Sequence, residues 1–322
     1  MTDTDLRIGT CSWVDKSLIK SATFYPRGCY TPEARLRFYS SIFPTVEVDT
    51  SYYAIPSRTT TQLWADRTPG TFKFHIKAFR LFTGHSAQIR VLPRELHDSA
   101  SDFADKKGLV NISRLPNNMI SYLWDLFSES ISPLFKLNKL GVVLFQFAPW
   151  VYPNPETFRH ILECKERLDG CQIAIEFRNR RWLEKDNLER TVSFLRQHEL
   201  IYVCVDEPQG FQSSVPPFVD ITGPGAYIRF HGRNDATWQI KTRSSAERFN
   251  YWYKEKELEE WVPRIEFLAR HVDNVNILFN TNNQDQGPGN ARLLSCLLKQ
   301  SPIATKVNGL DQILTIPNRS LV

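Results

Sequence analysis

The stretch "IAIEFRNRRW", residues 173–182, joins a short apolar run to a cluster of charges. The run 173–175 is typical of a strand that is buried on both faces, as in a parallel sheet. Glu176 and Arg178 follow at the place where such a strand ends, and residues two apart share one face of a strand. The pattern predicts a buried strand whose carboxyl end presents a carboxylate and a guanidinium group side by side.

Apolar runs of this kind recur along the chain. Most are rich in β-branched or aromatic residues and are too short for helices. Helical patterns lie between them: residues 31–43 begin with a threonine N-cap and a proline, and residues 187–200 and 255–272 repeat apolar residues every three or four positions. The eight apolar runs are "LRIGTCSW" (6–13), "TVEVDTSYY" (45–53), "FKFHIKA" (72–78), "GVVLFQFAP" (141–149), "IAIEFR" (173–178), "IYVCVDEP" (201–208), "AYIRFHG" (226–232) and "VNILFNTN" (275–282).

A strand that alternates with a helix eight times is the pattern of a (β/α)8 TIM-like barrel, an α/β fold. An open doubly wound sheet is the alternative, but it usually has fewer strands and a glycine-rich first turn, and "IGTCSW" contains no GxGxxG. We predict a single barrel domain over residues 1–322. Residues 80–140 are longer than one crossover and predict an enlarged loop or lid on the catalytic face between strands three and four. The last dozen residues, roughly, predict a loose C-terminal tail.

The composition is that of an ordinary globular protein, with 42% hydrophobic and 23% charged residues. The net charge of +5 permits an anionic partner without requiring one. The six cysteines form no CxxC pair and show no zinc-ligand spacing, which predicts reduced thiols. The first residues lack the pattern of a signal or transit peptide, and no uninterrupted apolar segment approaches ~18 residues. These features predict a soluble cytoplasmic protein without a membrane segment.

The carboxyl ends of the strands are the expected functional face, because the loops of a barrel converge there. Charged residues at these ends are costly inside a barrel unless they pair or face a site. Glu47, Asp49, Ser51 and Tyr53 alternate along one predicted strand and are expected to share a face. The candidate catalytic residues are Glu176, Asp206 and His231, and the candidate substrate-binding residues are Trp13, Glu47, Tyr53, Lys77, Gln146, Arg178, Arg229, Asn280 and Asn290.

Structural roles compete with several of these assignments. Glu176 paired with Arg178 or Arg229 is also consistent with a salt-bridge layer that closes the top of the barrel. His75 lies between two apolar residues and has the setting of a core histidine rather than of a ligand.

A divalent metal is a further alternative, because Glu47, Glu176, Asp206 and His231 are hard or borderline ligands. No HxH or HxxxH pair accompanies them, and the last strand offers Asn280 where metal-binding barrels often place a carboxylate. Neighbouring arginine and lysine residues also compete for the carboxylates. No cofactor is therefore expected, and a metal stays the open alternative.

The loop after the eighth run, "FNTNNQDQGPGNARLL", is rich in asparagine and glutamine. Gly287, Pro288 and Gly289 predict a turn before a helix that begins near Asn290. Helix N-termini present free N–H groups, and barrels often bind phosphate after strands seven and eight. A plain turn with an asparagine N-cap is the structural alternative.

Together these motifs resemble the DUF72 (YecE-like) family, in the same order from about residue 7 to residue 300. The resemblance rests on "IGTCSW … FYPRG", "FPTVEVDTSYYAIPS", "FKFHIKA", "GVVLFQFAPW", "AIEFRNRRW", "VDEP", "YIRFHG" and "FNTNNQDQGPGNA". It implies a TIM-like barrel, and it implies no activity. All candidate residues above fall on these motifs. The chain departs from the family pattern at Cys11-Ser12, Asp49, Asn179, Thr281 and Asp285, and its 80–140 loop is longer than the pattern implies.

The favoured hypothesis is an enzyme of hydrolase or lyase type that acts on a phosphate-bearing or nucleic-acid-like anionic substrate. Lys77, Arg178 and Arg229 would bind the charge. Glu176 or Asp206 would act as general base, with His231 as acid or base, while Trp13 and Tyr53 would stack on a ring.

Two other functions remain open. The first is a barrel that binds a nucleotide, RNA or a protein without chemistry, because the loops "RNRR" and "HGRNDATWQIKTRSS" are basic and the second interleaves an aromatic residue. The second is a glycosidase that uses Glu47 and Glu176, although the surrounding cations fit neutral sugars poorly.

Overall fold

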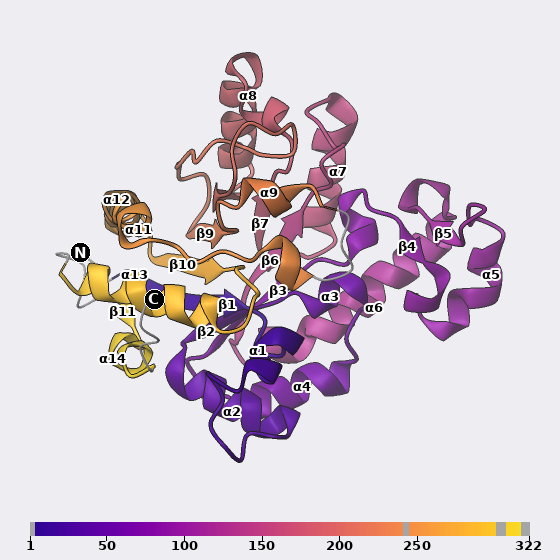
Figure 1. Cartoon of the computed structure of the whole chain (residues 1–322). Coiled ribbons are helices and arrows are strands. Elements are labelled where there is room, and N and C mark those ends of the chain that lie inside the picture. Colours follow the sequence, from indigo (N-terminus) through magenta and orange to yellow (C-terminus); the bar gives the residue numbers. More distant parts are fainter. Residues whose placement is uncertain (1–3, 241–244, 301–306, 317–322) are drawn as a thin grey trace.

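The computed structural model describes residues 4–240, 245–300 and 307–316, and it forms a closed barrel of parallel strands with helices outside (Figure 1). The last barrel strand pairs with the first, with Ile277 opposite Ile8, so the sheet has no open edge there. Each of the eight predicted runs overlaps one barrel strand, and the (β/α)8 prediction is confirmed. In the described residues the barrel strands are β1 (Asp5–Cys11), β2 (Thr45–Val48), β3 (Lys73–Lys77), β6 (Leu140–Gln146), β7 (Gln172–Glu176), β8 (Ile201–Asp206), β9 (Ala226–Phe230) and β10 (Asn274–Phe279).

The helices of the outer layer follow the predicted capping rules. Thr31 caps α2 (Pro32–Ile42) by accepting the N–H of Ala34, and proline occupies the first helical position. The predicted helix over residues 255–272 is two helices, α11 (Glu255–Glu259) and α12 (Val262–His271). Pro263 lies in the first turn of α12, where its missing N–H is tolerated, but it cannot lie inside one continuous helix. Within the described ranges, no helix has both the length and the apolar character that a bilayer span requires. The larger helices are α2, α4 (Arg58–Asp66), α6 (Asn117–Lys136), α7 (Pro155–Glu166), α8 (Lys185–Gln197), α12 and α13 (Gln286–Lys299), and the shorter ones include α1 (Lys16–Ser21) and α11.

The long connection between β3 and β6 divides into two parts. Its second part is α6, a crossover helix that buries Trp124 and Phe127 and that the sequence analysis missed. Its first part holds η1 (Arg80–Thr83), α5 (His97–Ser101) and a small antiparallel pair, β4 (Ala87–Gln88) with β5 (Leu109–Val110). Figure 1 shows β4, β5 and α5 at the outer edge of the molecule, beyond α6.

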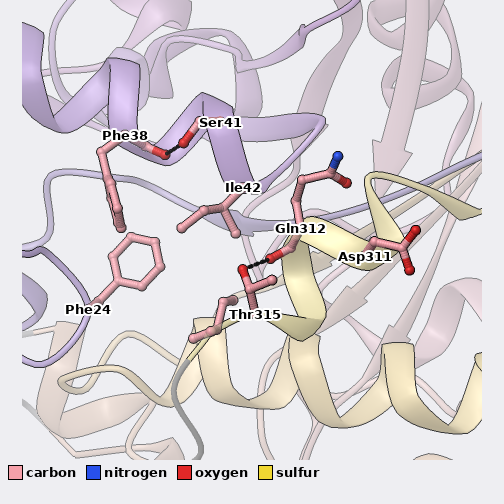
Figure 2. A pocket seen from close by; sticks show the side chains of 8 residues that line it. Phe24, Phe38, Ser41, Ile42, Asp311, Gln312 and Thr315 are labelled. Carbon is pink, nitrogen blue, oxygen red and sulfur yellow. Dashed lines mark hydrogen bonds between the residues drawn. The ribbon is translucent and has the colours of Figure 1, made fainter.

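Part of the predicted C-terminal tail is packed. α14 (Leu310–Leu314) buries Ile313 and contacts α2 and α13. Figure 2 shows the pocket of about 540 Å³ between α14 and α2, with Phe24 and Phe38 on the α2 side. Residues 317–322 lie outside the described residues.

The middle of the barrel interior holds polar side chains where branched apolar residues are usual. His75 is fully buried, its Nδ1 accepts the N–H of Val142 at 3.1 Å, and its ring meets Tyr227 edge to face at 5.0 Å. Gly141 makes room for this ring, because a Cβ there would lie 2.4 Å from His75 Nδ1.

We expect Gly141→Ala to destabilise the protein by about 1–3 kcal/mol, because the new methyl group would overpack the His75 ring. Urea denaturation would measure the loss. Gly70→Ala is the matched control, since nothing lies within 4 Å of its Cβ position. Equal stability of the two variants would show that the His75 ring can move away from the added methyl group, and it would contradict this prediction.

Candidate active site

Arg229 of β9 lies at the centre of the site, between two carboxylates from other strands. Its Nη1 donates to Glu176 Oε2 of β7, and its Nη2 donates to Glu47 Oε1 of β2 at 2.5 Å. The side chains of all three residues are fully buried. Arg229 therefore links strands from different sides of the barrel at their carboxyl ends.

Glu176 accepts hydrogen bonds from every side. The donors besides Arg229 are Gln146 Nε2 at 2.6 Å, His231 Nε2 at 3.0 Å and Arg178 Nη1 at 3.2 Å. Burial opposes its charge, but Arg229, His231 and Arg178 outweigh burial and hold the pKa of Glu176 well below its usual range. Glu176 is thus an ionised carboxylate whose acceptor capacity is used, which makes it an anchor rather than a free base.

The tautomer of His231 follows from its amide neighbours. Asn282 Nδ2 donates to Asn280 Oδ1 at 3.0 Å, so Asn280 turns its Nδ2 toward His231 Nδ1, also at 3.0 Å. Nδ1 therefore accepts, and Nε2 carries the proton and donates it to Glu176. Burial outweighs the attraction of Glu176 and, together with Arg229, lowers the pKa of His231 to about 3, so the ring is neutral.

Lys77 and Asp49 form an ion pair on the more exposed side of the site. Lys77 Nζ lies 3.2 Å from Asp49 Oδ1, and the side chains are 11% and 19% exposed. Burial opposes the charge of Lys77, but Asp49 outweighs it and raises the pKa of Lys77. Burial likewise opposes the charge of Asp49, and Lys77 with Arg229 lowers its pKa. Both groups are charged at neutral pH.

The predicted strand over residues 45–53 is shorter than expected. β2 ends at Val48, and α3 (Thr50–Tyr53) follows, so Asp49, Ser51 and Tyr53 do not share a strand face with Glu47. The Ser51 hydroxyl, which lies within 2.7 Å of the carbonyl oxygens of Val48 and Lys77, stabilises this turn. Tyr53 is 54% exposed on the rim.

Asp206, a predicted catalytic residue, faces the outside of the barrel wall, on the side away from Arg229. Val205 pairs with Arg229, and Asp206 therefore points to the opposite face. There its carboxylate accepts from Tyr253 Oη and Trp261 Nε1, both at 2.7 Å, and from Arg233 at 2.7 Å. Asp206 fastens the loop after β9 to the barrel wall.

Glu207, the next residue, is the interior carboxylate that the sequence analysis missed. Its Oε1 accepts the N–H of Val215 at 2.7 Å, while its Oε2 lies 3.5 Å from Arg178 Nη1 and has no hydrogen-bond partner in the described residues. Burial, against the attraction of Arg178, raises the pKa of Glu207 to about 7. The motif "VDEP" contains both carboxylates, but β8 is buried on both faces and its apolar pattern therefore hides which one points inward.

Trp13 lies outside the site. Its ring meets Trp64 at 5.5 Å and Phe74 at 6.2 Å, edge to face, and it is almost completely buried. β1 ends at Cys11, and Ser12 adopts a positive φ of 82°, so the chain turns before Trp13. Trp13 is thus a packing residue rather than a stacking platform at the mouth.

Asn290 is also structural, and the helix that carries it begins earlier than predicted. α13 starts at Gln286, so the Gly-Pro-Gly segment is its first turn. Proline is tolerated there because N–H groups in the first turn have no partner within the helix. Asn290 is buried, donates to Thr281 Oγ1 at 2.9 Å and accepts the N–H of Tyr253 at 3.2 Å. It holds the loop after β9 against α13.

A group of cations surrounds this centre. Burial and the nearby charges of Lys77, Arg80 and Arg178 lower the pKa of His85 to about 3. Arg178 lies over the ring of Trp238 at 4.6 Å. Lys77 and Arg80 lie over the ring of Tyr52 at 4.8 and 5.2 Å, and this ring meets His85 edge to face at 5.4 Å.

Arg248 adds a further guanidinium group, which lies over the same Trp238 ring at 5.2 Å. The Nε atoms of Arg80, Arg178 and Arg248 are buried and have no hydrogen-bond partner in the described part of the chain. Unused buried donors are costly, so these groups are suited to an added acceptor.

The residues that approach a metal-binding arrangement are Cys11, Glu47 and Asp49, whose ligand atoms lie within 4.8 Å of one another. Arg229 Nη2 already lies among them, 2.5 Å from Glu47, 3.6 Å from Cys11 Sγ and 3.9 Å from Asp49. Burial and Glu47 raise the pKa of the Cys11 thiol well above its usual value, and a neutral thiol is a poor ligand. This donor set fits the guanidinium of Arg229 rather than a divalent cation.

The sequence model of the family described as "Protein of unknown function DUF72" matches residues 7–311. The chain belongs to the DUF72 family. The UPF0759 protein YunF of Bacillus subtilis (strain 168) is 31% identical over 295 residues, which cover 90% of this chain and 94% of that protein.

Two solved DUF72 structures share the fold. The protein from Enterococcus faecalis V583 has a TM-score of 0.73 at 24% identity and covers 91% of this chain and 95% of its own. The protein from Thermotoga maritima MSB8 has a TM-score of 0.71 at 24% identity, with 92% and 99% coverage. The family resemblance is confirmed, and none of these names carries an activity.

We expect Asp206→Ala to lower the free energy of unfolding by about 3 kcal/mol, because Tyr253, Trp261 and Arg233 would lose a buried acceptor. Chemical denaturation would measure it. Asp220→Ala is the control: Asp220 pairs with the exposed Arg196, and its loss should cost about 1 kcal/mol or less. Similar losses would contradict the anchoring role.

We expect Glu207→Gln to change the pH dependence of stability. With a folded pKa of about 7, Glu207 keeps its proton in the folded protein while the unfolded chain releases it near pH ~4.3, so the parent loses stability as pH rises between these values. The variant lacks this loss. Its free energy of unfolding relative to that of the parent should therefore rise by about 3 kcal/mol between about pH 4.5 and about pH 7. Urea denaturation across this range checks it, with Glu129→Gln on the outer surface as control; parallel curves for parent and Glu207→Gln would contradict it.

Proposed function

We propose that this DUF72 protein is an enzyme of hydrolase or lyase type that acts on a phosphate-bearing anion at the carboxyl-terminal mouth of its barrel. The observation that carries the proposal is the set of unused buried guanidinium donors beside a carboxyl group with a pKa of about 7. The first feature favours an anionic ligand, and the second favours proton transfer at neutral pH.

The anion would bind to Arg80, Arg178 and Arg248. Guanidinium groups match phosphate oxygens in geometry and charge, and each of these groups has an N–H group without a partner in the described ranges. Arg178 and Arg248 flank Trp238, which holds both cations near the same point. Lys77 adds a charge that Asp49 only partly offsets, because the same carboxylate also faces Arg229.

Glu207 would serve as the general acid or base. It has a free carboxylate oxygen, lies 3.5 Å from Arg178 and titrates near neutral pH. Glu176 and His231 keep a supporting role, because Glu176 holds Arg178 and Arg229 in place and His231 is fixed in one neutral tautomer. Arg229 supplies the buried positive charge between Glu47 and Glu176, and the proposal needs no metal ion.

Binding of single-stranded nucleic acid without chemistry is the second candidate. Exposed rings on the rim favour it: Tyr53 is 54% exposed, Trp150 is 61% exposed, and Arg181 lies over the exposed Tyr152 ring at 5.7 Å. Such rings stack on bases without sequence preference. Salt-sensitive RNA binding that survives Glu207→Gln, without turnover of any phosphate ester, would favour this candidate.

We expect Arg178→Ala to weaken binding of phosphate monoesters about 10- to 100-fold, because a charge-assisted hydrogen bond contributes about 1.5–3 kcal/mol. Calorimetry with nucleoside monophosphates and inorganic phosphate would measure this. Arg190→Ala is the matched control, since Arg190 also lies over an aromatic ring, Phe158 at 4.8 Å, but on α8 of the outer layer.

Glu207→Gln should retain ligand affinity within a few-fold and abolish phosphate release from a panel of phosphate esters. Unchanged affinity in Arg178→Ala would overturn the anion site. Unchanged turnover in Glu207→Gln would overturn its role as acid or base.

A further inference from the structure

Three loops bring a series of aromatic rings together at one side of the mouth. Tyr52 follows β2, His85 follows β3 and Trp150 follows β6, and these three strands are neighbours in the barrel. The His85 ring meets Tyr52 at 5.4 Å and Trp150 at 5.3 Å, edge to face in both contacts. The series therefore extends from the ring that lies beside Lys77 and Arg80 to an indole that is 61% exposed.

Trp150 presents its ring to solvent from a fixed position. Its Nε1 donates to the carbonyl oxygen of Gly84 at 3.0 Å, although most of the residue is exposed. Gly84 adopts a positive φ of 81°, and a Cβ there would lie 2.8 Å from Val151 Cγ2, so glycine allows the loop after β3 to approach the loop after β6. An exposed indole that is held in this way loses little conformational entropy when a planar ligand stacks on it.

His85 offers an unused acceptor beside Trp150. The Thr83 hydroxyl donates its one proton to the carbonyl oxygen of Arg80 at 3.1 Å, so it accepts from His85 Nδ1 at 3.0 Å. Nε2 therefore carries a lone pair, and no partner for this atom lies among the described residues. Burial and the nearby cations keep the ring neutral, because they lower its pKa to about 3. A neutral imidazole in this tautomer is suited to an N–H donor from a ligand.

Arg80 supplies an unpaired positive charge next to this acceptor. Lys77 pairs with Asp49, whereas no carboxylate partner for Arg80 lies in the described part of the chain. The buried Nε of Arg80 also has no acceptor there. The carbonyl oxygen of Arg80 accepts the N–H of His85 at 3.2 Å, so the guanidinium and the imidazole come from one tight turn. An anion bound to Arg80 would therefore lie close to His85.

We propose that the substrate of the mouth is a nucleoside phosphate, whose base binds in a subsite formed by Trp150 and His85. This inference rests on the proposed function, because it assigns the phosphate to the cations described there. The base would stack on the exposed indole, and one of its N–H groups would donate to His85 Nε2. The phosphate would bind Arg80. A sugar phosphate would use the same cation but would leave the Trp150 ring uncovered.

The test compares adenosine 5′-monophosphate with ribose 5-phosphate, which has a phosphate and no base, by calorimetry. We expect the nucleotide to bind about 5- to 100-fold more tightly, which is the effect of one base stacked on an aromatic side chain. Trp150→Ala should remove this difference and leave the affinity for ribose 5-phosphate unchanged. Phe267→Ala is the matched control, because Phe267 is also exposed and lies 4.7 Å from a histidine ring, that of His271, but on α12 of the outer layer.

His85→Phe keeps an aromatic ring beside Tyr52 and Trp150 and removes the acceptor. It should weaken binding of the nucleotide about 2- to 10-fold, the effect of one neutral hydrogen bond, without weakening binding of ribose 5-phosphate. Equal affinity for the nucleotide in Trp150→Ala, Phe267→Ala and the parent protein would overturn the subsite.

Failure of the subsite and failure of the proposed function give different results. If ribose 5-phosphate binds as tightly as the nucleotide and Arg178→Ala weakens both, the subsite is wrong and the anion site stands. If adenosine binds as tightly as the nucleotide and Trp150→Ala abolishes both, the subsite stands and the anion site is wrong. Crystals of the unaltered protein soaked in the nucleotide do not depend on the folding of any variant. Base density on the Trp150 ring would support the proposal, and a base directed into solvent would overturn it.

Discussion

Arg229 is a guanidinium group without contact to water, and its charge is tolerated because two carboxylates accept from it. Removing an ion from water costs several kcal/mol, roughly, unless the geometry of its partners is good. Glu176 and Glu47 meet this requirement from β7 and β2, and Tyr227 donates to the second oxygen of Glu47 at 2.8 Å. The arrangement of the mouth depends on this contact, because Glu176 in turn orients Arg178 and His231.

Buried polar atoms without a partner in the described residues occur both at this centre and around it. Glu176 uses its oxygens fully, and His231 has a partner on each ring nitrogen. Arg229 itself, and Arg80, Arg178 and Arg248 around it, retain Nε donors without partners in the described residues, and Glu207 retains a free oxygen. A purely structural salt-bridge layer would pair its buried groups fully, so these unused atoms favour a ligand at the mouth.

Asp206 and Asn290 form a second, separate set of contacts outside the barrel wall. Both bind Tyr253, and Asp206 also binds Arg233 and Trp261. These contacts hold the loop after β9, which carries Trp238 and Arg248 toward the mouth. The motif residues thus fall into two groups. One group forms the site, and the other holds the loop after β9 that covers it.

The sequence by itself determined the number and order of the strands, because eight short apolar runs separated by helical patterns leave few folds for a chain of this length. It also placed Glu176, Arg178, Arg229 and His231 at strand ends, since charges cannot interrupt a buried strand elsewhere without great cost.

Only the tertiary structure decided the direction of each side chain. β8 is apolar on both faces, so the choice between Asp206 and Glu207 depended on its register with β9. Trp13 and Tyr53 were placed by turns after β1 and β2, whose hydrogen bonds join residues far apart in the chain. The direction of a side chain and its pairing partner depend on the neighbouring strands, so the sequence of one strand does not determine them.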